Sequence, residues 1–500
     1  MNQLTTPPIG QEVAGFLNQQ HCPFVGGEFL RRSNVADLPV IDPSTGQVLT
    51  RVVDSSSEVV DEAVRRARAA LSGPWAKMSP RDRERLILQL ADEIENDGAV
   101  LAELESLESG KAVAMARTLS VGGAVDWLRY YAGWATKIEG SSFSTSIAVP
   151  PGSDHFAVTV KEPVGVVAAI VPWNFPLLIA IWKMAPALAC GCTIILKPAE
   201  ETPLTALRLA SLTTKLGFPP GVINVVTGRG ESAGAALANH PGIDKITFTG
   251  STEVGKIIGK SAVDNMTRFT LELGGKSPMV IFEDVEEGLE PLMAGLGMFF
   301  NQGQVCTSAS RILIHRSIYD RTVANLSAAA SNLAFGSGRD PAAQINPLIS
   351  RKHRDRVLGF IERAENDGAR IVCGKRDLPA DGWFVAPTIF DGASSTSEIV
   401  QEEVFGPVVT ALPFSDMDEA IRLSNDSRYG LAASIWTRDL NKAFKCASEI
   451  KAGTVWINSH NTVDPNAPFG GYKQSGIGRE HGRAALDSYL ESKTVIIRYS

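Results

Sequence analysis

A repeated order of short apolar strands and helical segments constrains the fold of this chain more than any other feature of its sequence. Residues 164–171, 193–197, 222–226 and 245–249 are short apolar or β-branched runs, and helical segments such as 203–217 lie between them. Near-continuous apolar strands that alternate with helices indicate a parallel sheet that is covered on both faces. The sequence therefore predicts an α/β fold with a doubly wound, Rossmann-like domain.

A second series of strand-like runs follows in the rest of the chain. They lie at 278–282, 311–314, 408–412, 434–437 and 454–458. This repetition predicts a second doubly wound domain with a parallel sheet. Residues 1–140, in contrast, are predicted to be mainly helical, because 55–71 and 79–97 are amphipathic and Ser79-Pro80 supplies a helix cap and a first turn.

Residues 141–163 depart from the order of strands and helices. Two short β-prone runs flank Pro150-Pro151-Gly152, which indicates a hairpin. The last strand-like run, 493–499, needs a partner, which the hairpin or another subunit would supply. We therefore predict a protruding β element beside the two α/β domains.

Composition limits the classes of protein to which the chain can belong. At about 150 residues per domain, 500 residues suggest roughly three structural units, and a hydrophobic content of 44% excludes global disorder. No apolar run reaches about 18 residues, so no membrane-spanning helix is expected. The net charge of −7 disfavours wholesale binding to nucleic acid or to an anionic membrane.

Cysteine usage and the N-terminal segment favour a cytoplasmic location. The six cysteines form neither a dense disulfide framework nor a C-x-x-C pair, so no metal site is predicted. Such sparse usage fits a reducing compartment. Residues 1–20 lack a basic region, a continuous apolar core and arginine, which argues against a secretory or mitochondrial signal.

Two glycine-rich segments are candidate phosphate-binding turns. GRGESAG (228–234) follows a strand, but its last spacing is one residue too long for the dinucleotide fingerprint. GSTEVGK (250–256) is close to a P-loop, yet Ile257 stands where that motif needs Ser or Thr for magnesium, so a P-loop nucleotide hydrolase is disfavoured. The helix start in this segment still suits a pyrophosphate, with Ser251 as a hydroxyl donor; a plain capped helix is the alternative.

Three further segments carry possible chemistry. Lys197-Pro-Ala-Glu200 follows a strand directly, where an acid can accept hydrogen bonds from the ribose of NAD; a surface ion pair is the alternative. Glu272 lies at an apolar strand end in LELGGKSP (271–278), and Cys306 lies among small and polar residues in FFNQGQVCT (299–307). Taken singly, the cysteine is more often a buried small hydrophobe than a nucleophile.

Together these segments resemble the aldehyde dehydrogenase superfamily over essentially the whole chain. The motifs that carry the resemblance are PWNFP (172–176), KPAE (197–200), FTGSTEVG (248–255), LELGGKSP (271–278), FNQGQVC (300–306), EEVFGPV (402–408) and PFGGYKQSGIGRE (468–480). Within the superfamily, INPLISR (345–351) and WINSHNTVDPNAPFGG (456–471) are most similar to phenylacetaldehyde dehydrogenases.

The resemblance implies a covalent mechanism of aldehyde oxidation. Cys306 would attack the aldehyde carbon as a thiolate and form a thiohemiacetal. The amide of Asn174 and the backbone N–H of Cys306 would hold the oxyanion. Glu272 would activate the water that hydrolyses the resulting thioester, and Glu480 would relay the proton.

The resemblance also implies a set of cofactor-binding residues for NAD. They are Trp173, Lys197, Glu200, Gly230, Gly250, Ser251, Glu403 and Phe405. Glu200 would bind the hydroxyls of the adenosine ribose, and its charge would repel a 2′-phosphate, so NADP is expected to be the poorer cofactor.

Substrate-pocket residues follow from the resemblance in the same way. They are Phe175, Trp182, Phe300, Thr307, Val463 and Phe469. Aromatic walls without a fixed cation suit phenylacetaldehyde or another apolar aryl aldehyde and fit poorly with a semialdehyde, whose carboxylate would need an arginine. Other aldehyde classes, such as betaine or aliphatic aldehydes, are the alternatives, and for any single Phe a plain core role is equally compatible with the sequence.

Domain limits and assembly also follow from the resemblance. Residues 1–140 and 164–273 are expected to form the NAD-binding domain and 274–480 the catalytic domain, while 141–163 and 481–500 bridge subunits in a homotetramer that is a dimer of dimers. A catalytically silent protein on the same fold would have lost Cys306, Glu272 or Asn174, all of which are present, and Glu272 favours hydrolysis over transfer of the acyl group to CoA.

Overall fold

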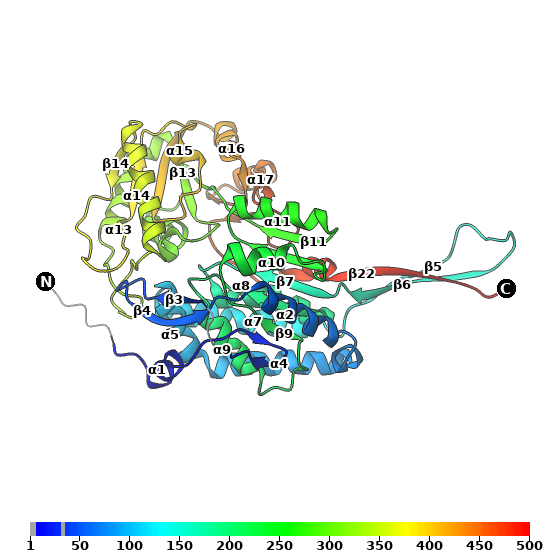
Figure 1. Ribbon diagram of the computed structural model, residues 1–500. Coiled ribbons are helices and arrows are strands. Elements are labelled where there is room, and N and C mark those ends of the chain that lie inside the picture. Colours follow the sequence, from blue (N-terminus) through cyan, green and yellow to red (C-terminus); the bar gives the residue numbers. More distant parts are fainter. Residues whose placement is uncertain (1–6, 32–35) are drawn as a thin grey trace.

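The computed structural model describes residues 7–31 and 36–500 and contains two large sheets and a protruding ribbon. In Figure 1 the sheet nearer the N-terminus fills the lower part of the molecule, and the second sheet lies above it in yellow and orange. Residues 1–6 lie outside the described residues; they are the start of the segment 1–20, in which no targeting signal is predicted. Within the described ranges, no helix is both long and apolar enough to cross a membrane.

The first sheet confirms the predicted α/β domain. Its strands run in the order β2-β1-β9-β8-β7-β10-β11-β21. The parallel centre consists of β7 (Val166–Ile170), β8 (Thr193–Lys197), β9 (Ile223–Val225), β10 (Lys245–Thr249) and β11 (Arg268–Glu272). The connections between them contain α8 (Pro176–Cys190), α9 (Leu204–Thr213), α10 (Ala235–Ala238) and α11 (Thr252–Asp264).

Alternate residues of the parallel strands enter two separate cores. Val167 and Ile194 pack in one hydrophobic cluster, while Val166 and Ile195 pack in another. Successive side chains of a strand point to opposite faces, so the sheet is buried on both sides. This burial explains why the sequence shows near-continuous apolar runs rather than an alternation of apolar and polar residues.

Seven α-helices of the described residues lie before β7, and the second and fourth of them start within two residues of the predicted helices 55–71 and 79–97. They are α1 (Gln11–Leu17), α2 (Ser57–Ala70), α3 (Pro74–Lys77), α4 (Pro80–Asn96), α5 (Gly98–Ser109), α6 (Val113–Met115) and α7 (Gly122–Ala132). The expectation that 1–140 is mainly helical misses the strands β1 (Phe24–Val25), β2 (Glu28–Phe29), β3 (Asp37–Ile41) and β4 (Val48–Val53). β1 and β2 have two residues each, too few for a period-2 pattern, and Pro39 weakens the strand signal of β3.

The second sheet confirms the second predicted series of strands. Its order is β14-β15-β16-β13-β12-β18-β19. The strands are β12 (Ser277–Ile281), β13 (Ala309–His315), β14 (Arg370–Cys373), β15 (Thr388–Asp391), β16 (Val408–Phe414), β18 (Ala432–Trp436) and β19 (Thr454–Ile457). The helices of this part are α12 (Glu290–Leu292), α13 (Tyr319–Ser331), α14 (Arg351–Asn366), α15 (Glu398–Gln401), α16 (Met417–Asn425) and α17 (Leu440–Glu449). Only the edge strand β14 runs antiparallel to its neighbour; the other pairs are parallel.

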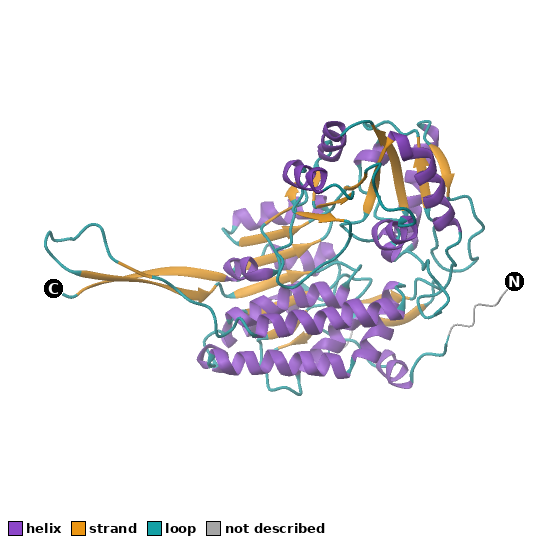
Figure 2. Cartoon of the chain, turned by 180° about the vertical axis from the view of Figure 1, so that it is seen from behind, coloured by secondary structure: helices purple, strands orange, loops and turns teal. Residues whose placement is uncertain are grey.

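The C-terminal part returns to the first sheet and then leaves the body of the molecule. β20 (Tyr472–Lys473) pairs with β17 (Tyr429–Gly430), and β21 (Gly476–Ile477) adds an antiparallel strand beside β11. After α18 (Gly482–Leu486), β22 (Leu490–Arg498) pairs with β6 (His155–Pro163), which also pairs with β5 (Ser142–Phe143). The hairpin of the same chain is thus the partner of the C-terminal strand. Figures 1 and 2 show this ribbon projecting from the body.

Candidate active site

The predicted chemical residues come together where strands of the two sheets end. Glu272 is the last residue of β11, Ser251 caps α11 directly after β10, and Asn174 lies between β7 and α8. Cys306 approaches from the other sheet, because it follows the short 3-10 turn Phe300–Gly303 and precedes β13. Carboxyl ends of parallel strands form the usual ligand crevice of open α/β sheets.

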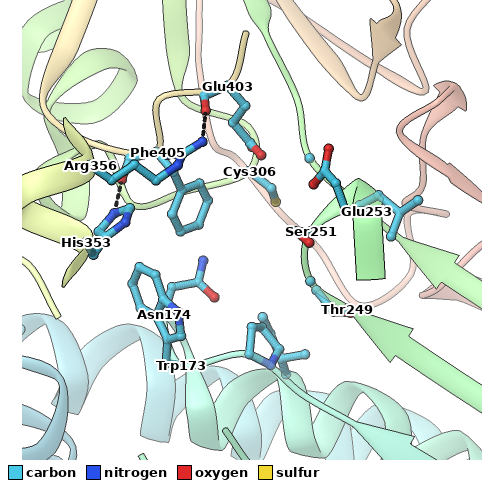
Figure 3. Close-up of a pocket in the computed structure, with 15 residues that line it drawn as sticks. Trp173, Asn174, Thr249, Ser251, Glu253, Cys306, His353, Arg356, Glu403 and Phe405 are labelled. Carbon is cyan, nitrogen blue, oxygen red and sulfur yellow. Dashed lines mark hydrogen bonds between the residues drawn. The ribbon is translucent and has the colours of Figure 1, made fainter. Parts of the chain in front are cut away.

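Two cavities meet at Cys306. A cavity of about 370 Å³, here called the sheet-end cavity, is lined by five of the predicted cofactor residues and by Asn174 and Cys306. The five are Trp173, Gly250, Ser251, Glu403 and Phe405. A second cavity of about 240 Å³, here called the aromatic tunnel, is lined by all six predicted substrate residues and again by Asn174 and Cys306. Figure 3 shows Cys306 across the sheet-end cavity from Trp173 and Asn174.

Close backbone contacts hold the loop that carries Cys306. Asn301, Gln302 and Gly303 all have left-handed backbone angles, with φ of 46°, 57° and 68°. A Cβ at Gly303 would lie 2.1 Å from the Gly406 carbonyl oxygen, and a Cβ at Gly275 would lie 2.3 Å from that of Cys306. The loop therefore requires glycine at both positions, which explains the glycines of the LGGK and NQG motifs.

Burial favours the protonated form of the Cys306 thiol. Burial and then the negative charges of Glu403 and Glu272 raise the pKa of Cys306. The backbone N–H groups of Cys306 and Thr307 act in the opposite direction and lower the pKa. A thiol whose pKa is raised can act as a nucleophile only after a base has taken its proton.

Asn174 is buried beside the cysteine loop and has spare hydrogen-bonding capacity. Its Nδ2 donates to the carbonyl oxygen of Gln304 at 3.0 Å, which leaves one amide hydrogen for another acceptor. The Oδ1 of Asn174 is buried without a hydrogen-bond partner among the described residues. An amide fixed in this way beside a cysteine can stabilise an oxyanion.

Glu272 and Glu480 form a pair of buried carboxyl groups. Both carboxyl oxygens of Glu272 are buried and lack hydrogen-bond partners in the described part of the chain. Burial and then the charge of Glu480 raise the pKa of Glu272 well above its usual range. Glu480 forms an ion pair with the buried Lys183, which belongs to none of the motifs found in the sequence.

Glu272 lies behind the cavity walls rather than in them. It is absent from the described residues that line either cavity, whereas the next residues, Leu273 and Gly274, line the sheet-end cavity. A Cβ at Gly470 would lie 2.8 Å from the Oε1 of Glu272, so the carboxyl group points toward that glycine.

Three predicted cofactor residues lie outside the sheet-end cavity. Lys197 is buried, and its Nζ lies 3.2 Å from the carboxylate of Glu200, which is 41% exposed. Gly230 is exposed at the start of the turn Gly230–Gly234. A Cβ at Gly234 would lie 3.9 Å from the Cε of Lys197, so this turn and Lys197 are neighbours.

Glu403 and Phe405 are fixed by residues that the sequence did not single out. Oε1 of Glu403 accepts a hydrogen bond from the backbone N–H of Gly275 at 2.9 Å, and burial raises the pKa of this carboxyl to about 7. Nε2 of His353 donates to the Phe405 carbonyl at 2.7 Å, and Arg356 donates to the Glu403 carbonyl at 2.9 Å (Figure 3). Both partners lie on α14, about fifty positions away, and carry no motif of their own.

Further lining residues were missed as well. Glu253 and Thr249 line the sheet-end cavity, and Asp126, Trp127 and Asn461 line the aromatic tunnel. Asn461 lies inside the segment that had already supplied Val463, so its neighbourhood could have identified it. Asp126 and Trp127 belong to α7, whose sequence shows only an ordinary helical pattern.

The chain has an α/β fold with a cysteine between a sheet-end cavity and an aromatic tunnel, an arrangement that suits an oxidoreductase. The chain belongs to the aldehyde dehydrogenase family, whose model matches residues 29–495. It is 48% identical to phenylacetaldehyde dehydrogenase of Pseudomonas fluorescens over 97% of both chains. It is also 45% identical to human retinal dehydrogenase 2, over 95% of this chain and 91% of the relative.

Solved structures confirm the fold. An NAD⁺ complex of an aldehyde dehydrogenase from Bacillus cereus superposes with a TM-score of 0.96 at 44% identity, covering 99% of this chain and 100% of the other. Betaine aldehyde dehydrogenase from Staphylococcus aureus, solved with NAD⁺, gives a TM-score of 0.93 at 38% identity, with coverage of 98% and 97%. The family and fold predicted from the sequence are therefore confirmed.

Proposed function

We propose that this aldehyde dehydrogenase oxidises phenylacetaldehyde or a similar arylacetaldehyde to the carboxylic acid, with NAD as the electron acceptor. The observation that carries the proposal is the aromatic tunnel, which leads to Cys306 and has Phe175, Phe300 and Phe469 among its walls. The rings of Phe175 and Phe300 are stacked, with centroids 6.3 Å apart. Aryl groups bind well between such surfaces.

The residues of the sheet-end cavity fit a dinucleotide. Ser251 begins α11, and the first backbone N–H groups of a helix attract a pyrophosphate. A Cβ at Gly274 would lie 2.2 Å from Oε2 of Glu403, so this glycine makes room for the carboxyl group that we assign to the nicotinamide ribose. Lys197, Glu200 and Gly230 would hold the adenosine end, and the charge of Glu200 favours NAD over NADP.

The first half of the proposed reaction joins the sulfur of Cys306 to the aldehyde carbon. Cys306 loses its proton to a nearby base and attacks the aldehyde carbon, and the oxyanion accepts hydrogen bonds from Asn174 and the Cys306 N–H. One such donor contributes about 2.7–4 kcal/mol to the stability of the transition state. NAD held by the residues of the sheet-end cavity would supply the acceptor for the hydride of the aldehyde carbon.

Hydrolysis completes the proposed cycle. The thioester left on Cys306 is attacked by water, whose proton passes to Glu272, and the acid and the free thiol are released. Glu480 and Lys183, which are buried beside Glu272, would take the proton onward. Glu272 must turn from Gly470 toward Cys306 for this step.

A cationic aldehyde is a second candidate substrate because of one observation. Asp126 is exposed and lines the aromatic tunnel together with Trp127, so a carboxylate and an indole ring are both available to a positive charge. The same carboxylate disfavours a semialdehyde, whose own carboxylate it would repel. Among the described lining residues of the tunnel there is no Lys or Arg.

Steady-state kinetics tests the proposal. Reduced cofactor is followed at its absorbance with phenylacetaldehyde, acetaldehyde and betaine aldehyde, and with NAD or NADP. We expect the highest kcat/KM for phenylacetaldehyde with NAD; a higher value for betaine aldehyde would favour the second candidate. Cys306→Ala is expected to abolish turnover, whereas Cys373→Ala, at a buried cysteine outside both cavities, is expected to retain it.

The protruding ribbon supports a proposed homotetramer. β22 pairs with β6 on one side only among the described strands, and its Ile496 and Ile497 are 57% and 50% exposed. A long edge strand with exposed apolar side chains tends to pair with another chain. We therefore propose that a second subunit packs against β22. The cytoplasmic location and the proposed domain limits stay predictions.

A further inference from the structure

Two residues of the loop after β19 form hydrogen bonds with Thr307, the residue that follows Cys306. Thr307 is buried directly after Cys306 and meets His460 and Asn461, which lie more than 150 positions further along the chain. We propose that His460 and Asn461 are positioning residues: they hold Thr307 by its hydroxyl and its backbone carbonyl and so fix the peptide groups around the Cys306 sulfur. This inference rests on the proposed role of Cys306.

The hydrogen-bond directions follow from the chemistry of the partners. Nδ2 of Asn461 donates to the carbonyl oxygen of Leu296 at 2.7 Å, so Oδ1 is the atom that faces Thr307. The hydroxyl of Thr307 donates to this Oδ1 at 2.6 Å. Thr307 therefore presents no free hydroxyl hydrogen to a substrate in the tunnel.

His460 is held as a single tautomer. Its Nε2 lies 3.0 Å from the carbonyl oxygen of Thr307, which can only accept, so Nε2 carries the hydrogen. Its Nδ1 lies 3.0 Å from Oγ of Ser434 and accepts a hydrogen bond from it. Burial lowers the pKa of His460 to about 4, which keeps the ring neutral at physiological pH.

His460 is itself held against the second sheet. Ser434 belongs to β18, and the ring of His460 lies 4.9 Å from that of Trp456 on β19. Asn461 has a left-handed backbone with φ of 57°, a conformation that Asn tolerates better than most residues. The contacts of His460 therefore fix Thr307 relative to β18 and β19.

The position of Thr307 matters for the reactivity of the thiol. The backbone N–H groups of Cys306 and Thr307 lower the pKa of the thiol and so favour the thiolate, against the charges of Glu403 and Glu272. If Thr307 turns, its N–H leaves the sulfur while the two carboxyl groups remain. Loss of these hydrogen bonds should therefore make Cys306 a weaker acid even when neither aldehyde nor cofactor is bound.

Alkylation of Cys306 in the full-length protein tests this inference independently of turnover. The rate with iodoacetamide is measured from pH 6 to 10, with Cys306→Ala as the blank for the other cysteines. We expect Thr307→Val, which keeps the shape but removes the hydroxyl, and His460→Phe to raise the apparent pKa by about one unit, which is about tenfold slower alkylation at neutral pH. Thr307→Ser keeps the hydroxyl and should retain the wild-type profile.

Kinetics separates positioning from damage to the substrate pocket. With acetaldehyde, which does not fill the tunnel, Thr307→Val should lower kcat while KM stays within about twofold. A wild-type alkylation profile in both Thr307→Val and His460→Phe would overturn the inference, and so would equal loss in Thr307→Ser. If His460→Phe fails to fold, the Val and Ser variants still decide, because Val keeps the shape of Thr without its hydroxyl and Ser keeps the hydroxyl. Turnover by Cys306→Ala would instead contradict the proposed mechanism itself.

Discussion

At the scale of single residues, the buried carboxyl group of Glu272 distinguishes the two halves of the proposed reaction. It has no hydrogen-bond partner among the described residues, so it is free to accept a proton from water. Glu272→Gln should lower kcat by about 10²- to 10⁴-fold, because hydrolysis loses its base while formation of the thioester continues. Rapid mixing should then show a burst of about one reduced cofactor per active site. Glu283→Gln, at a surface ion pair, is the control and should behave as wild type.

The pH dependence of turnover follows from the same carboxyl group. Burial and Glu480 raise the pKa of Glu272, and the base works only when it is ionised. Turnover should therefore fall as the pH is lowered through this raised pKa, at a higher pH than an exposed Glu would give. Initial rates at saturating substrate from pH 5 to 9 measure the effect. An acidic limb that stays unchanged in Glu480→Gln would contradict the assigned cause.

A second residue-scale prediction concerns the buried cation behind the tunnel wall. Lys111 forms an ion pair with Glu105, and both side chains are 1% exposed, while the Nζ lies 4.0 Å from the centroid of the Phe175 ring. Lys111→Met leaves a buried carboxylate unpaired and should destabilise the protein by about 3–5 kcal/mol. Urea unfolding measures this. Adding Glu105→Leu should restore much of the loss, and a double variant no more stable than the single one would contradict the explanation.

At the scale of elements, two helix caps offer a matched comparison. Ser251 caps α11 and Ser79 caps α4, and each hydroxyl accepts a backbone N–H at 3.2 Å. Ser251→Ala and Ser79→Ala should each destabilise the protein by about 0.5–2 kcal/mol. Only Ser251→Ala should also raise the KM for NAD, because α11 begins in the sheet-end cavity. Equal KM values in the two variants would argue against a cofactor at α11.

Elements with a strong local signal were predictable from the sequence. Apart from β11, the strands of both sheet centres begin and end within two residues of the predicted apolar runs, because burial on both faces leaves a continuous apolar pattern. β14 and β15 escaped prediction since Arg370–Cys373 and Thr388–Asp391 are short and mixed in polarity. The order of strands in the sheets is also set by packing between distant segments, which no local pattern encodes.

The candidate site was predictable where a motif carries it. The sequence motifs led to Cys306 and to the tunnel walls, but they gave no reason to choose His353 or Lys183, whose partners lie about 50 and 300 positions away. Nor could they orient Glu272, because its direction depends on the approach of Gly470 from another part of the chain. Contacts between remote segments are a property of the folded molecule, and one sequence contains no record of them.

At the scale of the whole molecule, the ribbon gives the protein a surface that a monomer would leave in water. β22 has nine residues, and Phe156, Val160 and Ile496 are 48%, 41% and 57% exposed on the ribbon. Exposed apolar area on a free strand edge is stabilised when a second chain covers it. The ribbon projects from the body, so it can reach another subunit without moving the two sheets (Figure 2).

Changing this surface should change the assembly before it changes the fold. Ile496→Glu places a charge where we propose an apolar contact, and burying it unpaired would cost several kcal/mol. Light scattering should show a tetramer for the wild type and smaller species for the variant, while Val48→Glu, at a site 54% exposed on β4, stays tetrameric. A monomeric wild type, or an unchanged tetramer with Ile496→Glu, would contradict the assignment. Because both cavities and Cys306 are built within one chain, the dissociated variant should still alkylate at Cys306.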